Sequence, residues 1–251
     1  MPHRLIVIAP SHYSEKAAWA LDLAKLPYVR EVHAPLAHIA AVKKAGGQRS
    51  TPTLVVEGEV KRVIGDSTDI LRWIQTEPNT AWRPYGPSDD PEILAWEERF
   101  DADLGPHSRR LAYFHLLPHK ALAVPCMTHG APGWEATMIG LTYPLVRAGM
   151  QKNMRIDATG AARSRDKLLA VFDAVDAALS DGRPFLCGDQ ISAADVTFAA
   201  LAGPLLLPAA YPTPLPRLDQ LPAAAQEALA GWADRPAGVY GLRVWAGRRV
   251  A

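Results

Sequence analysis

The stretch STPTLVVEGEVKRVIGDSTDILRWI, residues 50–74, carries the strongest local information about the fold. It contains two short apolar runs, TLVVE and EVKRVI, which meet across Gly58 and predict a tight β-hairpin. The residues GDS then form a polar break, after which Ile70, Leu71 and Ile74 recur at helical spacing. The stretch therefore predicts two antiparallel strands followed by a helix.

Four alternating elements precede this hairpin. Residues 5–9, LIVIA, form a continuous apolar run, which is typical of a strand covered on both faces. A helix is predicted over residues 14–26, a second strand over YVREVH at residues 28–33, and a weaker helix over residues 35–45 that ends at a glycine pair. The order β-α-β-α-β-β-α within the first 77 residues predicts an α/β domain.

The composition and the apolar spacing of the chain change after this domain. PNTAWRPYGPSDD, residues 78–90, is rich in Pro, Gly and Asn and predicts a linker. Beyond it we find no strand pattern, and apolar residues recur at helical spacing. The predicted helical faces are Ile93/Trp96/Phe100/Leu104, Trp134/Met138/Leu141/Leu145 and Leu168/Val171/Val175/Leu179, followed by an apolar helix from Val196 to Leu207 and a last helix over about 222–233. The sequence thus predicts an α/β domain at 1–77, a linker at 78–90 and an all-α domain at 91–251.

Charge and composition exclude several classes of protein. Lys and Arg number 27, Asp and Glu 26, and the formal net charge is +1, so neither a nucleic-acid footprint nor a polybasic membrane anchor is indicated. The first apolar run is too short for a signal peptide and no apolar stretch is long enough to span a bilayer, so we expect a cytoplasmic location and no membrane partner. Cys126, expected in the loop PCMTHGAPG, and Cys187 form neither a CxxC nor a metal-type pair.

The segment SHYSEK, residues 11–16, lies between the first predicted strand and the first helix. The start of a helix presents unpaired N–H groups and the positive end of the helix dipole, which stabilise a thiolate and lower the pKa of a thiol. A hydroxyl at that point can also donate a hydrogen bond to the sulfur. Two interpretations of Ser11 stay open: a plain helix cap, which the residue type favours, and a group that activates a thiol.

Two further segments have a similar double interpretation. In STP, residues 50–52, the proline lacks an N–H and suits the start of a strand. A cis bond there would free the preceding backbone to pair with an extended ligand, whereas the sequence alone favours trans. In GDS, residues 65–67, Asp or Ser caps the following helix, and the same geometry can bind a carboxylate through the hydroxyl and the helix N–H groups.

The remaining motifs indicate a structural role or no functional site. SAAD, residues 192–195, is a capping box at the start of the apolar helix, and its expected role is structural. His115 and His119 are four residues apart, but Pro118 interrupts the helix and no third ligand is evident, so no metal site is predicted. Neither a G-x-S-x-G nucleophile motif nor a P-loop occurs.

Taken in order, these segments resemble the glutathione transferase superfamily over nearly the whole chain. The most specific matches are STPTLVVEG (50–58), GDSTDIL (65–71) and FLCGDQISAAD (185–195), which are similar to the family's proline-containing strand, its acidic-Ser glutathione motif and its capping-box helix. The tail WADRPAGVYGLRVWAGRR also looks like that of a bacterial member. The resemblance implies a thioredoxin-like N-terminal domain, an all-α C-terminal domain and a homodimer.

The resemblance places Ser11 where serine-type classes keep the hydroxyl that activates the thiol of glutathione, with Lys16 at the basic position five residues later. Cysteine-type classes carry Cys at the position of Ser11, and this chain has no cysteine in its first 125 residues. That argues against disulfide reductase or dehydroascorbate reductase chemistry, which needs a protein thiol. Tyr13 is the second choice for the activator.

The resemblance also implies the residues that hold glutathione: Arg49, Ser50, Thr51, Pro52, Asp66 and Ser67. Thr51 and a cis Pro52 would hold the cysteinyl backbone, and Asp66 with Ser67 the γ-glutamyl end. The chain departs from the family pattern where Asp66 replaces Glu, Thr51 replaces Val, and Ser50 replaces a basic or amide residue. Arg49 or Gln48 is therefore expected to serve the glycyl carboxylate.

The expected function is a transferase that activates glutathione, as co-substrate and without a metal, for attack on a small hydrophobic electrophile. The electrophile is expected in an apolar cleft between the domains, lined by Tyr13, Phe114 and Trp134. Two alternatives stay open. One is a binding or scaffold protein of the same fold without turnover. The other is a different glutathione-dependent reaction: dehalogenation, isomerisation, peroxide reduction or ether cleavage.

Overall fold

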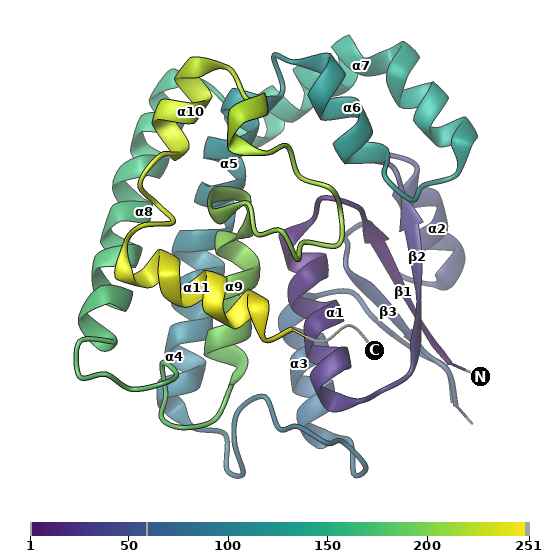
Figure 1. Cartoon of the computed structure of the whole chain (residues 1–251). Helices are drawn as coiled ribbons and strands as arrows, with labels where there is room; N and C mark the ends of the chain where they lie inside the picture. The colour runs from purple at the N-terminus through teal and green to yellow at the C-terminus, as the bar shows by residue number, and fades with distance from the viewer. Residues whose placement is uncertain (1, 59, 249–251) are drawn as a thin grey trace.

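The computed structural model describes residues 2–58 and 60–248, and its N-terminal part is built on a mixed four-stranded sheet (Figure 1). The strands are β1 (His3–Ile8), β2 (Tyr28–His33), β3 (Thr53–Val56) and β4 (Arg62–Ile64), in the order β2-β1-β3-β4. β1 and β2 run parallel, while β3 runs antiparallel to both β1 and β4. The antiparallel pair of β3 and β4 confirms the hairpin that the sequence predicted, and the sheet has a thioredoxin-like arrangement.

Helices cover both faces of the sheet, because successive side chains of a strand point to opposite faces and here both sets are apolar. On one face Leu5, Val7 and Leu54 pack in the same core as α1 (His12–Ala24) and α3 (Ser67–Thr76). On the other face Ile6 and Val55 pack against α2 (His38–Ala45). The continuous apolar run in the first strand thus reflects burial on both sides.

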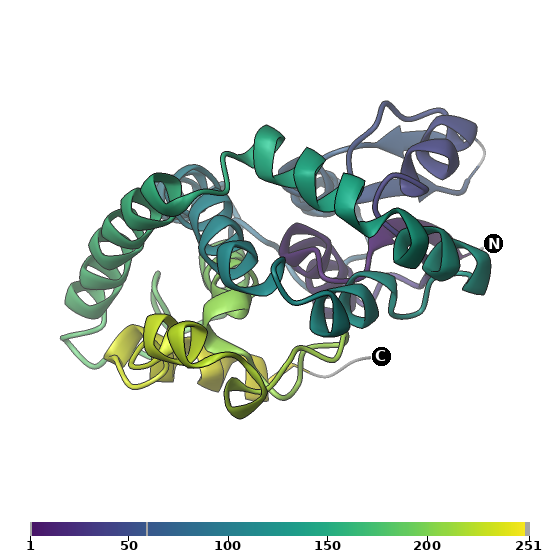
Figure 2. The same ribbon diagram turned by 90° about the horizontal axis from the view of Figure 1, so that it is seen from above.

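The C-terminal part is a bundle of helices beside α1 and α3 (Figure 1, Figure 2). α4 (Pro91–Arg99), a π-helical turn (η1, Phe100–Leu104) and α5 (Gly105–Leu116) follow one another directly. The remaining helices are α6 (Lys120–Thr128), α7 (Gly133–Met154), α8 (Ala158–Ala178), α9 (Ala193–Leu206), the short 3₁₀ turn η2 (Leu218–Gln220), α10 (Ala223–Leu229) and α11 (Pro236–Ala246). Residues 77–90 form no helix or strand, yet Trp82 Nε1 donates a hydrogen bond to the carbonyl of Ile191 at 2.7 Å and holds this connection against the bundle.

α9 is the central helix, and it buries every residue except Pro204. The predicted capping box opens it: the Asp195 carboxylate accepts hydrogen bonds from the backbone N–H groups of Ser192 at 2.7 Å and Leu186 at 2.8 Å. Tyr240 on α11 donates its hydroxyl to the same carboxylate. The box therefore fixes the start of α9 and also ties α11 to it.

The structure corrects the apolar face predicted for α7. Trp134, Leu141 and Leu145 are 66%, 80% and 76% exposed. The buried side of α7 instead carries Ile139 and Tyr143, which pack in a cluster with residues of α6. Two faces of this helix satisfy the helical spacing, and spacing does not say which of them meets the core.

Two local expectations near the other helices were also wrong. Cys126 lies on α6 and not in a loop, since Pro125 is accommodated inside this helix. Proline leaves the carbonyl four residues earlier, that of Ala121, without its helical partner, and both Ala121 and Pro125 are exposed to water. α11 lies beyond the last helix that the spacing predicted. None of the helices within residues 2–58 and 60–248 combines the length and apolarity needed to cross a membrane.

Candidate active site

Three segments far apart in the sequence meet at one end of the sheet. Ile6 lies opposite Thr53, so Ser11, after β1, and residues 50–52, before β3, reach the same edge. Leu54 lies opposite Ile64, so residues 65–67, after β4, reach that edge as well. The register of the strands is enough to bring together the three segments that the sequence analysis identified as candidate binding segments.

Ser11 is the N-cap of α1, with φ −78° and ψ 109°. Its Oγ accepts a hydrogen bond from the backbone N–H of Ser14 at 3.2 Å. The residue is partly exposed. A cap uses an oxygen lone pair and leaves the hydroxyl proton free to donate, so capping and donation to an anion are compatible.

The two residues after Ser11 are turned into the bundle. His12 is buried and its Nε2 lies 3.0 Å from the carbonyl of Gly105; burial, assisted by the nearby charge of Arg109, lowers the pKa of His12 to about 3. Tyr13 donates its hydroxyl to the carbonyl of Asp101 at 3.2 Å, and burial raises the pKa of Tyr13 above its ordinary value. Both side chains are therefore neutral near pH 7, and the tyrosine proton is already committed to a carbonyl.

Hydrogen bonds join the segment before β3 to the segment before α3. Ser50 donates its hydroxyl to the carbonyl of Gly65 at 2.8 Å, and Thr53 donates to the carbonyl of Ser50 at 2.7 Å. The Thr51–Pro52 peptide bond between them is cis, as the family resemblance implied and the sequence alone did not. Arg49, the residue before Ser50, is exposed.

Asp66 and Ser67 form the start of α3. Asp66 is the N-cap, and its carboxylate accepts a hydrogen bond from the backbone N–H of Thr68 at 2.8 Å. Ser67 is the first helical residue and is 2% exposed. The first N–H groups of a helix lack partners within the helix, which makes this end of α3 suited to an anion.

Lys16 connects the helix that carries Ser11 with the helix that carries Ser67. Its fully buried ammonium donates to Thr68 Oγ1 at 3.0 Å and forms ion pairs with Glu97 and Asp101, each at 2.8 Å. Two carboxylates and a hydroxyl thus satisfy one buried charge. The basic residue five positions after Ser11 therefore fixes α1, α3 and the helical bundle relative to one another.

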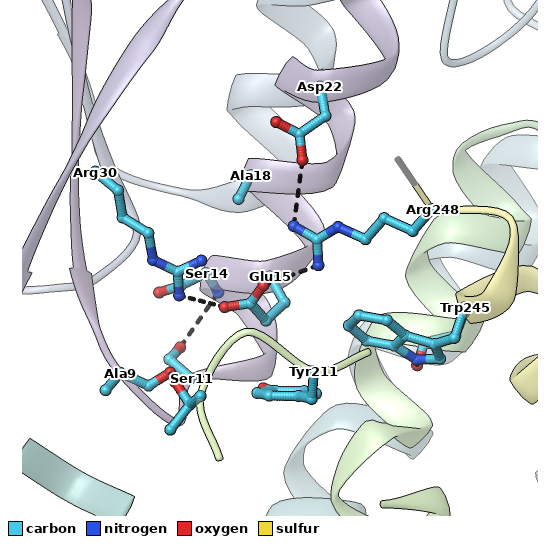
Figure 3. A network of polar contacts seen from close by, with 12 residues as sticks. Ala9, Ser11, Ser14, Glu15, Ala18, Asp22, Arg30, Tyr211, Trp245 and Arg248 are labelled. Carbon is cyan, nitrogen blue, oxygen red and sulfur yellow. Dashed lines mark hydrogen bonds and ion pairs between the residues drawn. The ribbon is translucent and has the colours of Figure 1, made fainter. Parts of the chain in front are cut away.

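A second buried network holds the first turn of α1 from the opposite end of the chain (Figure 3). Glu15, whose side chain is fully buried, pairs with Arg30 on β2 and with Arg248 Nη1 at 2.9 Å. Arg248 Nη2 lies 3.3 Å from Asp22, one to two turns further along α1. No local pattern in the sequence indicates this network, because 233 residues separate Glu15 from Arg248.

A mostly apolar pocket adjoins the Ser11 turn. It is lined by Pro10 and His12, the residues on both sides of Ser11, and by residues of α5, α6, α9, α10 and the chain between α9 and α10. The space inside it that a water-sized sphere can occupy is about 50 Å³. The three residues expected to line the electrophile cleft, Tyr13, Phe114 and Trp134, are not among its lining residues. Apolar spacing could not show which side of α5 faces this space, or that the lining includes no residue of α7.

The chemistry of the remaining candidates is limited. Burial raises the pKa of the Cys126 thiol to about 11, so this cysteine stays protonated near neutral pH. Within the described part of the chain, no group of three or more His, Cys, Asp or Glu side chains is placed to hold a metal ion. The arrangement thus offers a hydroxyl, helix N-termini and an apolar pocket, which suit an anionic or thiol-bearing ligand beside an apolar one.

Comparison with known proteins agrees with this fold. A family model described as "Glutathione S-transferase, N-terminal domain" matches residues 10–77, and one described as "Glutathione S-transferase, C-terminal domain" matches residues 158–235. The chain belongs to the glutathione S-transferase family. A comparison with curated proteins found no match.

Several solved structures share the whole architecture. A glutathione S-transferase of Ceriporiopsis subvermispora, crystallised in complex with glutathione, is 16% identical, with a TM-score of 0.63, and the match covers 100% of this chain and 99% of that one. The glutathione transferase URE2P8 of Phanerochaete chrysosporium, with oxidised glutathione, is 17% identical with a TM-score of 0.60, covering 99% and 90%. A possible glutathione S-transferase from Rhodopseudomonas palustris is also 17% identical, with a TM-score of 0.58, covering 100% and 96%. At these identities the likeness establishes the fold.

Proposed function

We propose that this chain is a glutathione transferase in which Ser11 activates the glutathione thiol for attack on a small apolar electrophile. The observation that carries the proposal is the convergence of the Ser11 turn, residues 50–52 and residues 65–67 at one end of the sheet, next to an apolar pocket. The two solved relatives that hold glutathione or oxidised glutathione support the choice of ligand. We extend the proposal to a cytoplasmic homodimer.

Each end of the tripeptide has a complementary partner in this arrangement. The γ-glutamyl carboxylate would meet the hydroxyl of Ser67 and the N–H groups at the start of α3, while Asp66 would meet the γ-glutamyl ammonium. The backbone of Thr51, next to Pro52, would pair with the cysteinyl unit. Arg49, which is exposed, or Gln48 would serve the glycyl carboxylate.

The chemistry starts from a weak nucleophile. A free thiol has a pKa of about 8.5, so most of it is protonated near pH 7. A hydrogen bond from the Ser11 hydroxyl and the N-terminal field of α1 would each favour the thiolate and release the thiol proton to water. The sulfur then forms a bond to the electrophilic carbon, and the leaving group departs with the electrons of the bond that breaks. Tyr13 is the weaker candidate, because its hydroxyl already donates to the carbonyl of Asp101.

Calorimetric titration with glutathione tests the binding site. Ser67→Ala should weaken binding by about tenfold or more, since a hydrogen bond to a charged group is lost. Ser180→Ala, which removes an exposed hydroxyl at the end of α8, is the matched control and should bind like the parent. Failure of the parent to bind millimolar glutathione would favour a scaffold protein without turnover.

The activator is tested by the ultraviolet absorbance of the bound thiolate as a function of pH. Ser11→Ala should retain glutathione binding and raise the apparent pKa of the bound thiol by about one to two units. Tyr13→Phe serves as the comparison and should leave the profile in place. A shift caused by Tyr13→Phe, with none caused by Ser11→Ala, would transfer the role to the tyrosine.

Self-association is tested separately by light scattering after size exclusion. Trp134, Leu141 and Leu145 present an exposed apolar face on α7, a feature that favours contact with another protein surface. We expect a mass of twice the monomer. A monomer at micromolar concentration would contradict this part of the proposal and leave the glutathione site untouched.

A further inference from the structure

The pocket beside Ser11 has an almost wholly neutral lining. Burial lowers the pKa of His12, assisted by the nearby Arg109, to about 3, and it lowers the pKa of His115 below its ordinary value. Burial raises the pKa of Cys126 to about 11 and that of Tyr113 to about 12. None of these four groups carries a charge near pH 7.

Arg109 on α5 is the one arginine, lysine or carboxylate among the residues that line this pocket. Within residues 2–58 and 60–248, it takes part in none of the ion pairs. Its neighbour Arg110 is fully engaged, donating to the carbonyl of Met154 at 2.8 Å and to Ser164 Oγ at 3.0 Å. The partly buried guanidinium of Arg109 therefore faces a neutral pocket without a protein counter-charge.

A cation in that position favours one kind of ligand. Apolar surroundings reduce the screening of a charge by water, so an unpaired cation gains from any anion that enters with an apolar body. Guanidinium presents a planar fork of N–H donors that matches a carboxylate in two parallel hydrogen bonds. The pocket thus combines a surface for an apolar group with a single site for a negative one.

We propose that Arg109 determines specificity and that the electrophile of this enzyme is an apolar molecule that carries a carboxylate. The inference rests on the proposed activation of glutathione at Ser11, because the pocket is placed by the two neighbours of that residue. The carboxylates of glutathione itself are assigned to the start of α3 and to Arg49 or Gln48. Arg109 is consequently available to the second substrate.

The matched probes are a chlorodinitrobenzoate, with chlorine para to the carboxylate and flanked by the nitro groups, and the corresponding benzamide. In both, the glutathione thiolate attacks the carbon that bears chlorine, a carbon–sulfur bond forms, and chloride leaves with the electrons of the broken bond. The carboxylate or amide is unchanged by the reaction. The two probes share the reacting centre and differ in charge. Because this difference also affects the reaction without enzyme, each enzymatic rate is divided by the rate of the uncatalysed reaction.

The parent should convert the benzoate with a higher corrected kcat/KM than the benzamide. Arg109→Gln should lower kcat/KM for the benzoate by about 10- to 100-fold, the usual effect of losing a hydrogen bond to a charged group, and change the benzamide by less than about threefold. Arg109→Lys should restore part of the preference, since it keeps the charge and loses the fork. Arg165→Gln, an exposed arginine on α8, removes the same net charge elsewhere and should retain the preference.

A binding measurement separates this inference from the proposed transferase activity. Dinitrobenzoate and dinitrobenzamide lack the leaving group, and their affinities are measured by calorimetry with the parent and with Arg109→Gln. Preferential benzoate binding that Arg109→Gln abolishes supports the pocket assignment even if neither reactive probe turns over, a result that would count against the transferase alone. Turnover or binding that favours the benzamide, or that Arg109→Gln leaves unchanged, overturns the inference and leaves the transferase standing. Loss of glutathione binding in Arg109→Gln also overturns it, because the guanidinium would then serve the tripeptide.

Discussion

We expect the buried ion pairs of Arg248 to contribute strongly to the stability of the fold. Arg248→Met removes the positive charge of this residue and tests that contribution. The guanidinium is 2% exposed, pairs with Glu15 and Asp22, and lies 5.2 Å from the ring centroids of both Trp19 and Trp245. Methionine can fill much of the space between the two rings while removing the cation. Glu15 then keeps only Arg30, and Asp22 keeps only the hydroxyl of a tyrosine.

The expected cost is about 3 kcal/mol, the lower end of the range for removing one partner of a buried pair, because each carboxylate retains one contact. For a chain of this size, that loss corresponds to a fall in Tm of roughly 6–12 °C. Thermal and urea unfolding measure both quantities. Arg217→Met, which breaks an ion pair whose side chains are 72% and 67% exposed, is the matched control and should leave Tm unchanged within error.

The pH dependence gives the prediction a second readout. Burial raises the pKa of Asp22, while Arg248 acts in the opposite direction. In Arg248→Met the pKa of Asp22 in the folded state rises further. Folding stability therefore falls more steeply as pH increases from the unfolded to the folded pKa of Asp22. The deficit against the parent should be larger near pH 7 than near pH 4. A variant within about 0.5 kcal/mol of the parent at neutral pH, or a deficit independent of pH, would refute the reasoning.

Three further predictions concern other parts of the molecule. Burial lowers the pKa of His33, but hydrogen bonds to two carboxylates outweigh it and raise the pKa overall. The stabilisation that His33 gives the folded state is therefore present below the unfolded pKa of about 6.5 and is lost as pH rises through the folded value. In urea titrations His33→Gln should cost more stability near pH 5.5 than near pH 8.5, and an equal cost at both pH values would contradict this prediction. Gly105→Ala would place its Cβ 2.2 Å from the tyrosine hydroxyl of α1 and should destabilise the protein by about 1–3 kcal/mol. Gly149→Ala, whose Cβ would have no atom within 4 Å, should stabilise the protein by about 0.5–1 kcal/mol. Changes in unfolding free energy of the same sign for both variants would contradict this prediction. The thiol of Cys126, with its pKa raised to about 11 by burial, should react with Ellman's reagent far more slowly at pH 8 in the folded protein than in urea, and equal rates would show that it is accessible.

The order of the elements up to α3 was readable in the sequence because it depends on local patterns. The apolar run in β1, the break at Gly58 and the spacing of Ile70, Leu71 and Ile74 each specify one element by periodicity or by turn chemistry. The capping box at residues 192–195 was also predictable, since its hydrogen bonds join residues three apart. The glutathione-binding role of residues 49–52 and 66–67 and the activating role of Ser11 remain predictions.

The faces of the helices required the tertiary structure. The spacing of Trp134, Leu141 and Leu145 is helical, yet these residues are exposed, because two stripes of α7 are apolar and only packing against α6 selects one. The same reason explains why Arg109 on α5 was not recognised as part of a pocket. Helical periodicity defines a face, and the neighbours of that face come from other parts of the chain.

The sequence by itself determined the order of the elements up to α3, the apolar helix α9 and the capping box that begins it, because these are properties of residues a few positions apart. The tertiary structure decided that the segments after Ile8, before Thr53 and after Ile64 share one edge, that Glu15 meets Arg248, and that Arg109 faces a neutral pocket. These contacts join residues that lie between about fifteen and more than two hundred positions apart. Strand register and helix packing set such contacts, and neither leaves a local trace in the chain.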